Sequence, residues 1–197
     1  MPRTADKTDI PRRLAAAGYA LFNQQGYNAT GIQQITEHAG VPKGSFYNHF
    51  DSKEAFAAQI LRNYADWVDQ AWQRGMAGAP ASPVAAIRHL FGTFIAHHAQ
   101  AGCQGCLVGN FAAELADASP QCRAVLASVL ADWRTRLAAL IAQAQQAGEV
   151  RQDIEAGALS AFFWDAWEGA VLRTKVDHGV QALHDMLDVM LGRLLRP

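Results

Sequence analysis

A short run of polar side chains, beginning at Lys43, could bind a nucleic acid. Its members with ammonium, hydroxyl, amide or imidazole groups are Lys43, Ser45, Tyr47, Asn48 and His49. Such groups donate hydrogen bonds to phosphate oxygens and base edges, and a lysine gains free energy by releasing counterions from phosphate. Phe46 and Phe50 are four residues apart and share the opposite face of a helix. The run therefore predicts a short helix with one buried side and one DNA-facing side.

A second segment with reactive groups is 102–110, which holds two of the three cysteines. The Cys-x-x-Cys spacing of Cys103 and Cys106 suggests zinc, but zinc needs four ligands and no second pair is present. No βαβ pattern surrounds the pair, which argues against a thioredoxin-like redox site. We therefore expect no metal and no cofactor. Cys122 stands apart from both.

Two interpretations of Cys106 stay open. Cys103 and Cys106 could be small apolar residues in a glycine-lined turn. Alternatively, Cys106 falls in the first turn of a helix, where unpaired N–H groups and the helix dipole would stabilise a thiolate. Asn110 and Glu114 follow Cys106 along one helical face, and a polar stripe beside a thiol of low pKa would suit an electrophile or an oxidant. Lys175 is a possible cation partner for Cys106.

If Cys106 does not react, a non-covalent effector pocket is the alternative. The residues that could line it are Trp67, Phe94, His98, Trp133, Phe163, Trp164 and Trp167. They would form a largely apolar cavity with few polar anchors. The same aromatic side chains are also typical of an ordinary core.

The elements that must position these groups are helices, because almost every segment repeats its apolar residues with a helical period. Thr30, with Gln33 three residues later, predicts the start of the second helix, and Gly40 predicts its end. Ser52 caps a long helix, with Glu54 completing the cap. We expect an all-α fold of about nine helices, near 10–25, 31–39, 42–49, 52–75, 83–100, a short one before Pro120, 121–147, 154–175 and 179–195.

Two short helices joined by a turn that contains Gly40 predict a helix-turn-helix. Residues 40–54, Gly-Val-Pro-Lys-Gly-Ser-Phe-Tyr-Asn-His-Phe-Asp-Ser-Lys-Glu, resemble the signature of the tetracycline-repressor (TetR) family of bacterial transcriptional regulators. The resemblance extends from about Ile10 to about Phe56. It departs at Pro42, where the family more often has Ser or Thr. It implies a DNA-binding domain over 1–53 and an effector-binding and dimerisation domain over 54–197.

The predicted DNA contacts fall into three groups. Lys43 and Lys53 are placed for phosphate, and Lys53 also begins a helix whose N–H groups attract an anion. The resemblance implies that Tyr47 and His49 clamp the DNA backbone. Gly44 permits close approach to that backbone, and the candidates for reading base edges are Thr30, Gln33, Ser45 and Asn48.

The last helix repeats apolar residues at alternating spacings of three and four: Val180, Leu183, Leu187, Met190 and Leu194. This spacing is compatible with the core of one chain and with a seam between two chains. The resemblance favours a homodimer through the last two helices. Two recognition helices held about 34–36 Å apart could then engage a palindromic DNA operator.

Composition agrees with a DNA-facing end on an otherwise neutral protein. The 197-residue chain has a net charge of −1, whereas residues 1–53 hold six lysines and arginines against four acidic residues. No run approaches the ~18 apolar residues of a membrane helix. Asp6 and Asp9 are unlike a secretory signal, and three cysteines give no disulfide framework, so we expect a cytoplasmic protein.

The sequence thus predicts a transcriptional repressor released from DNA by a small effector. Gly-Cys-Leu-Val-Gly-Asn followed by Ala-Ala-Glu-Leu resembles a TetR subgroup that responds to quinones, maleimides and unsaturated aldehydes, which would implicate Cys106. The alternative is a regulator of an efflux or catabolic gene with a non-covalent lipophilic ligand and structural cysteines. An enzyme that uses Cys106 as nucleophile is not expected, because no His-and-carboxylate set accompanies it. A non-specific architectural DNA binder would leave 54–197 without a role.

Overall fold

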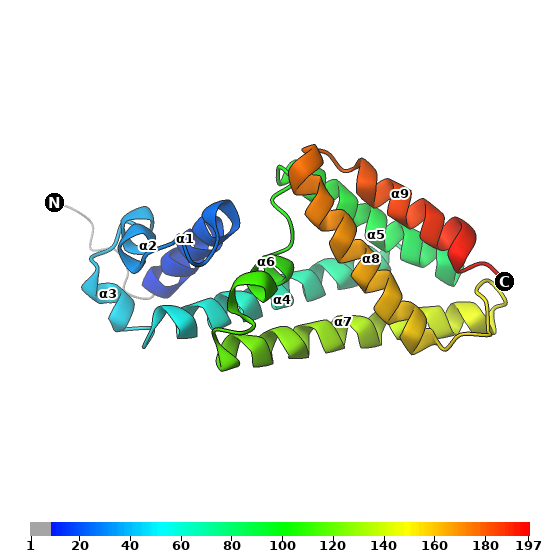
Figure 1. Cartoon of the computed structure of the whole chain (residues 1–197), viewed down its shortest axis with the longest axis horizontal. Helices are drawn as coiled ribbons and strands as arrows, with labels where there is room; N and C mark the ends of the chain where they lie inside the picture. Colours follow the sequence, from blue (N-terminus) through cyan, green and yellow to red (C-terminus); the bar gives the residue numbers. More distant parts are fainter. Residues whose placement is uncertain (1–8) are drawn as a thin grey trace. The chain divides into compact units, whose positions relative to one another are not determined.

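The computed structural model describes residues 9–197, and the regular elements of this part are all helices (Figure 1). They are α1 (Ile10–Gln25), α2 (Ile32–His38), α3 (Gly44–Tyr47), α4 (Lys53–Ala77), α5 (Pro83–Gln100), α6 (Leu107–Leu115), α7 (Pro120–Gln146), α8 (Ala156–Asp177) and α9 (Gln181–Val189), which continues as a π-helical turn (Met190–Leu194). The all-α prediction is confirmed. Arg3, Asp6 and Lys7, which enter the predicted charge balance, lie outside the described residues.

The chain forms two compact units that alternate along the sequence. The first contains the residues up to Ala65 together with Leu107–Ala127, and the second contains Asp66–Cys106 and Ser128–Pro197. Helices α4 and α7 each contribute their first part to one unit and the rest to the other. These units differ from the predicted consecutive domains 1–53 and 54–197, because α6 is compact with the N-terminal helices. The functional boundary near residue 53 stays a prediction.

The first unit is built on a cluster of phenylalanine rings. The ring centroid of Phe22 lies 5.9 Å from that of Phe56 and 5.2 Å from that of Phe111, and Phe46 lies 5.2 Å from Phe56. All four side chains are fully buried. Gly18 gives the Phe56 ring its space, because a Cβ at this position would lie 2.4 Å from the ring. The apolar faces of α1, α3, α4 and α6 meet here.

Two predicted helix starts differ in detail from the structure. The residue that caps α2 is Gly31, whose N–H donates to Gln34 Oε1 at 2.8 Å. The predicted opener, Thr30, instead donates its hydroxyl to Gly26 O at 2.6 Å. Ser52 caps α4 as predicted, since its Oγ accepts from Ala55 N at 3.0 Å. Glu54 does not complete that cap but accepts the hydroxyl of Ser119.

The second unit is centred on α5, α8 and α9, and α9 contacts both of the others (Figure 1). Phe91 of α5 packs on Phe163, Trp164 and Trp167 of α8, with ring centroids 4.6–5.4 Å apart. The predicted seam of the last helix is largely internal. Leu183, Leu187 and Met190 are buried, whereas Leu194, in the π-helical turn, is 46% exposed. The three buried positions therefore serve the core of their own chain.

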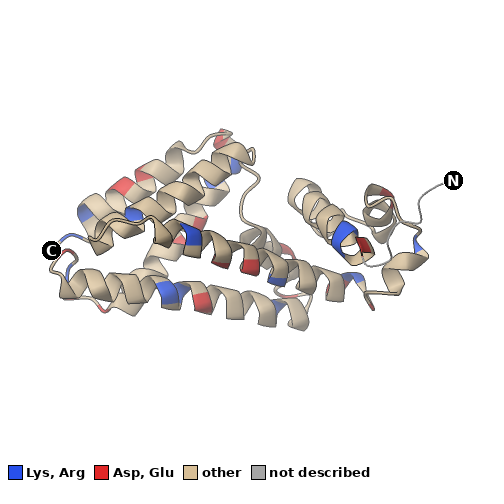
Figure 2. Ribbon diagram, turned by 180° about the vertical axis from the view of Figure 1, so that it is seen from behind, with Lys and Arg blue, Asp and Glu red and all other residues tan. Residues whose placement is uncertain are grey.

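Charged residues of both signs lie along α4 and α7 (Figure 2). Within the second unit, one such pair joins the two helices, because Arg136 Nη2 donates to Asp69 Oδ2 at 2.7 Å. This ion pair raises the pKa of the guanidinium further. Over residues 9–197, no helix has the length and apolar character needed to cross a membrane.

Substitution of Gly18 by Ala should lower the free energy of unfolding by about 1–3 kcal/mol, because the new methyl group overpacks against the Phe56 ring. Rings on several sides hold Phe56, so it has little room to move. Gly92→Ala is the matched control. A Cβ at this mid-helix position would meet no neighbouring atom of the described residues within 4 Å, so the substitution should stabilise by about 0.5–1 kcal/mol. Urea unfolding checks both, and equal effects of the two would contradict the packing argument.

Candidate DNA interface and effector site

Helix α3 and the residues beside it present most of the predicted DNA contacts on the surface. Exposed side chains or backbone are found at Lys43, Gly44, Tyr47, Asn48 and His49. Ser45 is half-buried, and Phe46 beneath it is fully buried. The predicted buried side is therefore confirmed at Phe46, whereas Phe50 is half-buried and follows the end of α3. The polar groups remain accessible to a phosphate or a base edge.

Arg13 fixes the turn between α2 and α3, a role that the sequence did not predict. Its Nη2 donates to Ala39 O at 2.5 Å and to Gly40 O at 2.9 Å. Gly40 has a φ of 62°, a left-handed conformation that favours glycine. Val41 N then donates to Thr36 O at 2.9 Å and closes the end of α2. One cation on α1 thus satisfies two carbonyls at the turn that positions α3.

The structure corrects two of the predicted DNA contacts. Thr30 is 1% exposed, so its side chain cannot reach a base edge. Lys53 is half-buried, its Nζ donates to Tyr27 O at 2.6 Å, and it lies 3.9 Å from the centre of the Tyr27 ring. Desolvation lowers the pKa of this ammonium. Gln33 remains exposed, with its amide donating to Glu37 Oε1 at 2.8 Å.

Glu114 of α6 also has a structural role in the first unit. Its Oε1 accepts from Tyr27 N at 3.1 Å and its Oε2 from Asn28 N at 2.8 Å. The carboxylate thus binds the free N–H groups of the loop between α1 and α2, while Lys53 binds a carbonyl of the same loop. These contacts account for Glu114 without an effector, and its predicted place in an effector site is not supported.

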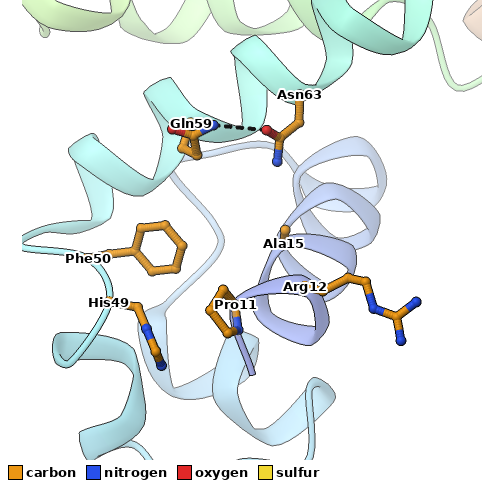
Figure 3. Close-up of a pocket in the computed structure, with 7 residues that line it drawn as sticks. All are labelled: Pro11, Arg12, Ala15, His49, Phe50, Gln59 and Asn63. Atoms are coloured by element: carbon orange, nitrogen blue, oxygen red, sulfur yellow. Dashed lines mark hydrogen bonds between the residues drawn. The ribbon is translucent and has the colours of Figure 1, made fainter. Parts of the chain in front are cut away.

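An open hollow of about 500 Å³ lies in the first unit, beside the end of α3 (Figure 3). It is lined by Pro11, Arg12, Ala15, His49, Phe50, Gln59 and Asn63. Gln59 Nε2 donates to Asn63 Oδ1 at 2.9 Å along one wall. His49 is the one predicted DNA contact among these lining residues. Its imidazole therefore borders a concave surface as well as the exposed side of α3.

The cysteine segment is an irregular loop with three left-handed residues. Gly102, Cys103 and Gly105 have φ angles of 75°, 57° and 87°. Cys103 N donates to His98 O at 3.0 Å, which anchors the loop to the end of α5. Cys106 directly precedes α6, whereas we expected it within the first turn. All three cysteines are thiols and all are buried, with Cys106 6% exposed.

Glu168 is the partner of Cys106 that the sequence did not predict. The Cys106 thiol donates a hydrogen bond to the Glu168 carboxyl, and desolvation raises the pKa of Glu168 to about 7. Glu168 lies on α8, directly after Trp167 and three residues before the buried Val171. The sequence feature that could have indicated Glu168 is a carboxyl one turn after Trp164, in a helix otherwise rich in aromatic residues. It was overlooked because its partner lies 62 residues earlier in the chain.

The predicted pocket aromatics pack mainly on one another. Trp133 and Trp164 stack with centroids 5.4 Å apart, and Trp164 Nε1 donates to Trp133 O at 3.0 Å. The ring centroids of Phe94 and His98 lie 6.5 Å and 6.2 Å from that of Trp167. Burial lowers the pKa of His98 to about 4, so it is neutral at pH 7. These contacts are those of a packed aromatic core.

The remaining predicted effector residues are spread over several elements. Trp67 is half-buried, with its ring 4.5 Å from His97. Asn110 is half-buried on α6, and Lys175 is exposed near the end of α8. Their effector roles stay predictions. Cys122 is fully buried, and burial raises the pKa of its thiol, so it is placed as a structural residue.

Comparison with known proteins finds two family profiles along the chain. Residues 14–60 match the family described as bacterial regulatory proteins, tetR family, and residues 83–190 match the tetracyclin repressor-like C-terminal domain. The transcriptional repressor DhaR of Mycobacterium sp. (strain GP1) is 33% identical over 96% of this chain and 94% of its own length. The transcriptional repressor NemR of Escherichia coli K12 is 28% identical over 91% and 90%. The crystal structure of regulatory protein TetR from Rhodobacter sphaeroides superimposes with a TM-score of 0.87 and 31% identity, covering 93% of this chain and 98% of that one.

Glu168 should make stability depend on pH between about 4.5, its ordinary pKa, and about 7. Because its pKa is raised in the folded state, the protonated form stabilises the fold, and that contribution is lost as pH rises through 7. Relative to Glu168→Gln, the wild type should lose up to about 3 kcal/mol across this window. His98 acts in the opposite direction, but it is common to both proteins and cancels. Thermal unfolding at pH 4.5–8 measures the difference, and a constant difference would contradict a half-buried Glu168 that titrates in this window.

Proposed function

The chain belongs to the tetR family of bacterial regulatory proteins, and on this premise we propose that it is a DNA-binding transcriptional repressor controlled by a small effector. The observation that carries the proposal is the exposed polar surface of α3 and the residues beside it, within the segment that matches the tetR family profile. The relatives named above are regulators rather than enzymes. We propose that the protein is cytoplasmic, because a bacterial regulator binds its operator DNA in that compartment.

The proposed DNA contacts are those that stay accessible in the first unit. Lys43, Tyr47 and His49 bind the phosphate backbone, and Gly44 allows it to approach closely. Ser45 of α3, Asn48 directly after this helix and Gln33 of α2 are the candidates for base edges. Thr30 and Lys53 leave this set, because the fold uses both side chains.

We propose that two copies associate through α8 and α9. Large apolar side chains exposed on these helices and the π-helical turn after them are Phe162, Leu172, Val176, Val189 and Leu194. Covering them with a second copy would remove apolar surface from water, which favours association. A two-fold dimer would present two α3 helices to a palindromic operator with half-sites about 34–36 Å apart.

We propose Cys106 as the effector-sensing residue and a small unsaturated electrophile as the effector class. Support comes from its thiol character, its position directly before α6 and its hydrogen bond to Glu168. Because Cys106 is buried, a reagent reaches it when the 101–106 loop opens. The loop's left-handed Cys103 costs backbone energy that opening would relieve. Lys175, in the same compact unit as Cys106, remains a candidate neighbour of a bound effector.

Lys43→Ala should weaken operator binding for all sequences alike and reduce the salt slope of log K by about one per subunit. A phosphate contact gains from counterion release but reads no base. Arg88→Ala is the control, because this exposed arginine of α5 pairs with Asp188 in the second unit. Binding titrations at several salt concentrations measure the slopes. If Lys43→Ala left the slope unchanged, Lys43 would not bind phosphate.

N-ethylmaleimide should release the wild type from its own upstream DNA and should not release Cys106→Ser. Cys103→Ser is the matched control from the same loop and should respond like the wild type. Electrophoretic mobility shifts with and without reagent provide the measurement. Equal release of wild type and Cys106→Ser, or release of neither, would make Cys106 structural and favour a non-covalent lipophilic ligand. Equal affinity of the unmodified wild type for its own upstream DNA and for random DNA would argue against an operator there.

A further inference from the structure

Helix α8 carries one half-buried carboxyl group, that of Glu168, beside the aromatic side chains that face the core of the second unit. Glu168 directly follows Trp167, which is 3% exposed, and lies one turn after the buried Trp164. The other acidic residue of this stretch, Asp165, has a 67% exposed side chain and pairs with Arg134 at 3.0 Å. Glu168 has no such cation partner among the interactions that set its pKa, which are desolvation and the Cys106 hydrogen bond.

The carboxyl of Glu168 accepts its hydrogen bond from the thiol of Cys106. The Cys106 side chain is almost excluded from solvent, and the loop before it is tied to α5 by the bond from Cys103 N to His98 O. Water is therefore a poor acceptor for the thiol proton at this site. The carboxyl that contacts the thiol is the group placed to receive it.

A buried thiol is a weak nucleophile, since the thiolate is the reactive form and apolar surroundings disfavour it. Enzymes overcome this limit by placing a base within hydrogen-bond reach of the nucleophile. We propose that Glu168 is the general base that accepts the proton of Cys106 when its sulfur attacks a small unsaturated carbonyl compound. The inference rests on the proposed sensing function of Cys106.

The step is a conjugate addition and needs no oxidant. The S–H bond breaks and its proton moves to a carboxylate oxygen of Glu168. The sulfur electron pair forms a C–S bond to the β-carbon, and the π electrons of the C=C bond move toward the carbonyl to give an enolate. Glu168 then returns the proton to the α-carbon. The sum is addition of S–H across the double bond, with Glu168 regenerated.

The product changes the hydrogen bonding at Glu168. A thioether has no proton to donate, so the ionised carboxyl loses its partner in a desolvated place. Leaving an ionised, desolvated carboxyl without a hydrogen-bond donor is unfavourable. This cost favours a rearrangement of α8 or of the loop, and it is specific to modification at Cys106.

Other titratable groups lie on the elements that surround this part of α8. They include Arg88, His89, His97 and His98 on α5, Cys103 in the loop, Asp165, Arg173, Lys175 and Asp177 on α8, Arg134 on α7, and His184, Asp185 and Asp188 on α9. Among the described residues, Cys106 is the titratable group that alters the pKa of Glu168. The pH dependence near neutrality is therefore assigned to Glu168.

The test is the second-order rate of Cys106 alkylation by N-ethylmaleimide in the full chain, followed by quenching and peptide mass spectrometry at pH 5.5–8.5. The wild-type rate should rise with pH and level off near pH 7, where Glu168 becomes ionised. Glu168→Gln should be about 10–100-fold slower at pH 7, without levelling, because only the spontaneous thiolate then reacts. Asp165→Asn, on the same helix, should match the wild type.

The outcomes separate this inference from the function on which it rests. Equal rates and pH profiles of wild type and Glu168→Gln would overturn the general-base role, even if the reagent still releases DNA. Failure of the folded wild type to react, while unfolded protein does, would overturn sensing at Cys106 itself. If Glu168→Gln does not fold, Glu168→Asp decides. This variant retains a carboxyl, so its alkylation rate should be reduced but should still level off near pH 7. A rate that keeps rising above pH 7 would contradict the proposal.

Discussion

The carboxylate of Glu114 holds together the part of the molecule that presents α3. The loop between α1 and α2 has backbone N–H groups at Tyr27 and Asn28 that no helix satisfies, and each donates to one oxygen of Glu114. Lys53 meets the carbonyl of Tyr27 from the start of α4. Two charge-assisted hydrogen bonds from Glu114 and one from Lys53 hold the loop that leads into α2. The turn held by Arg13 then fixes where α3 begins.

The same helix that supplies Glu114 directly follows Cys106. Helix α6 starts at Leu107, so a covalent change at residue 106 acts on the chain one residue before this helix. Such a change alters DNA binding only if it favours one arrangement of α6 over another, since equal stabilisation of both shifts nothing. The hydrogen bond between Cys106 and Glu168 is made directly before α6 begins. The hydrogen bonds of Glu114 are made by a residue within α6. The strengths of these contacts can change.

Local signals in the sequence were sufficient for most helices but not for the contacts between them. The end of α1 and the start of α5 follow the sequence prediction. Gly26 ends α1, and α5 begins at Pro83 with Ser82 as its cap. Thr30 was misjudged by one residue, since Gly31 and Gln34 form the cap. The sequence predicts that Lys53 binds phosphate and that Glu114 lies in the effector site, because the local pattern around each charged side chain shows no intramolecular partner. Their actual partners are 26 and 87 residues away, and nothing local reveals a contact at that distance.

The sequence order of the first unit has a consequence for how the protein is made. Phe111 and Glu114 complete the core and the loop of the N-terminal helices, yet they are synthesised after α4 and α5. The nascent chain must therefore extend past α6 before α1–α3 have their full set of contacts. A chain truncated before residue 107 would have its N-terminal helices without this support. A gene fragment that ends at Ala65 would encode a unit lacking its C-terminal segment, so α3 and its supporting helices cannot be separated from the chain by a single cut.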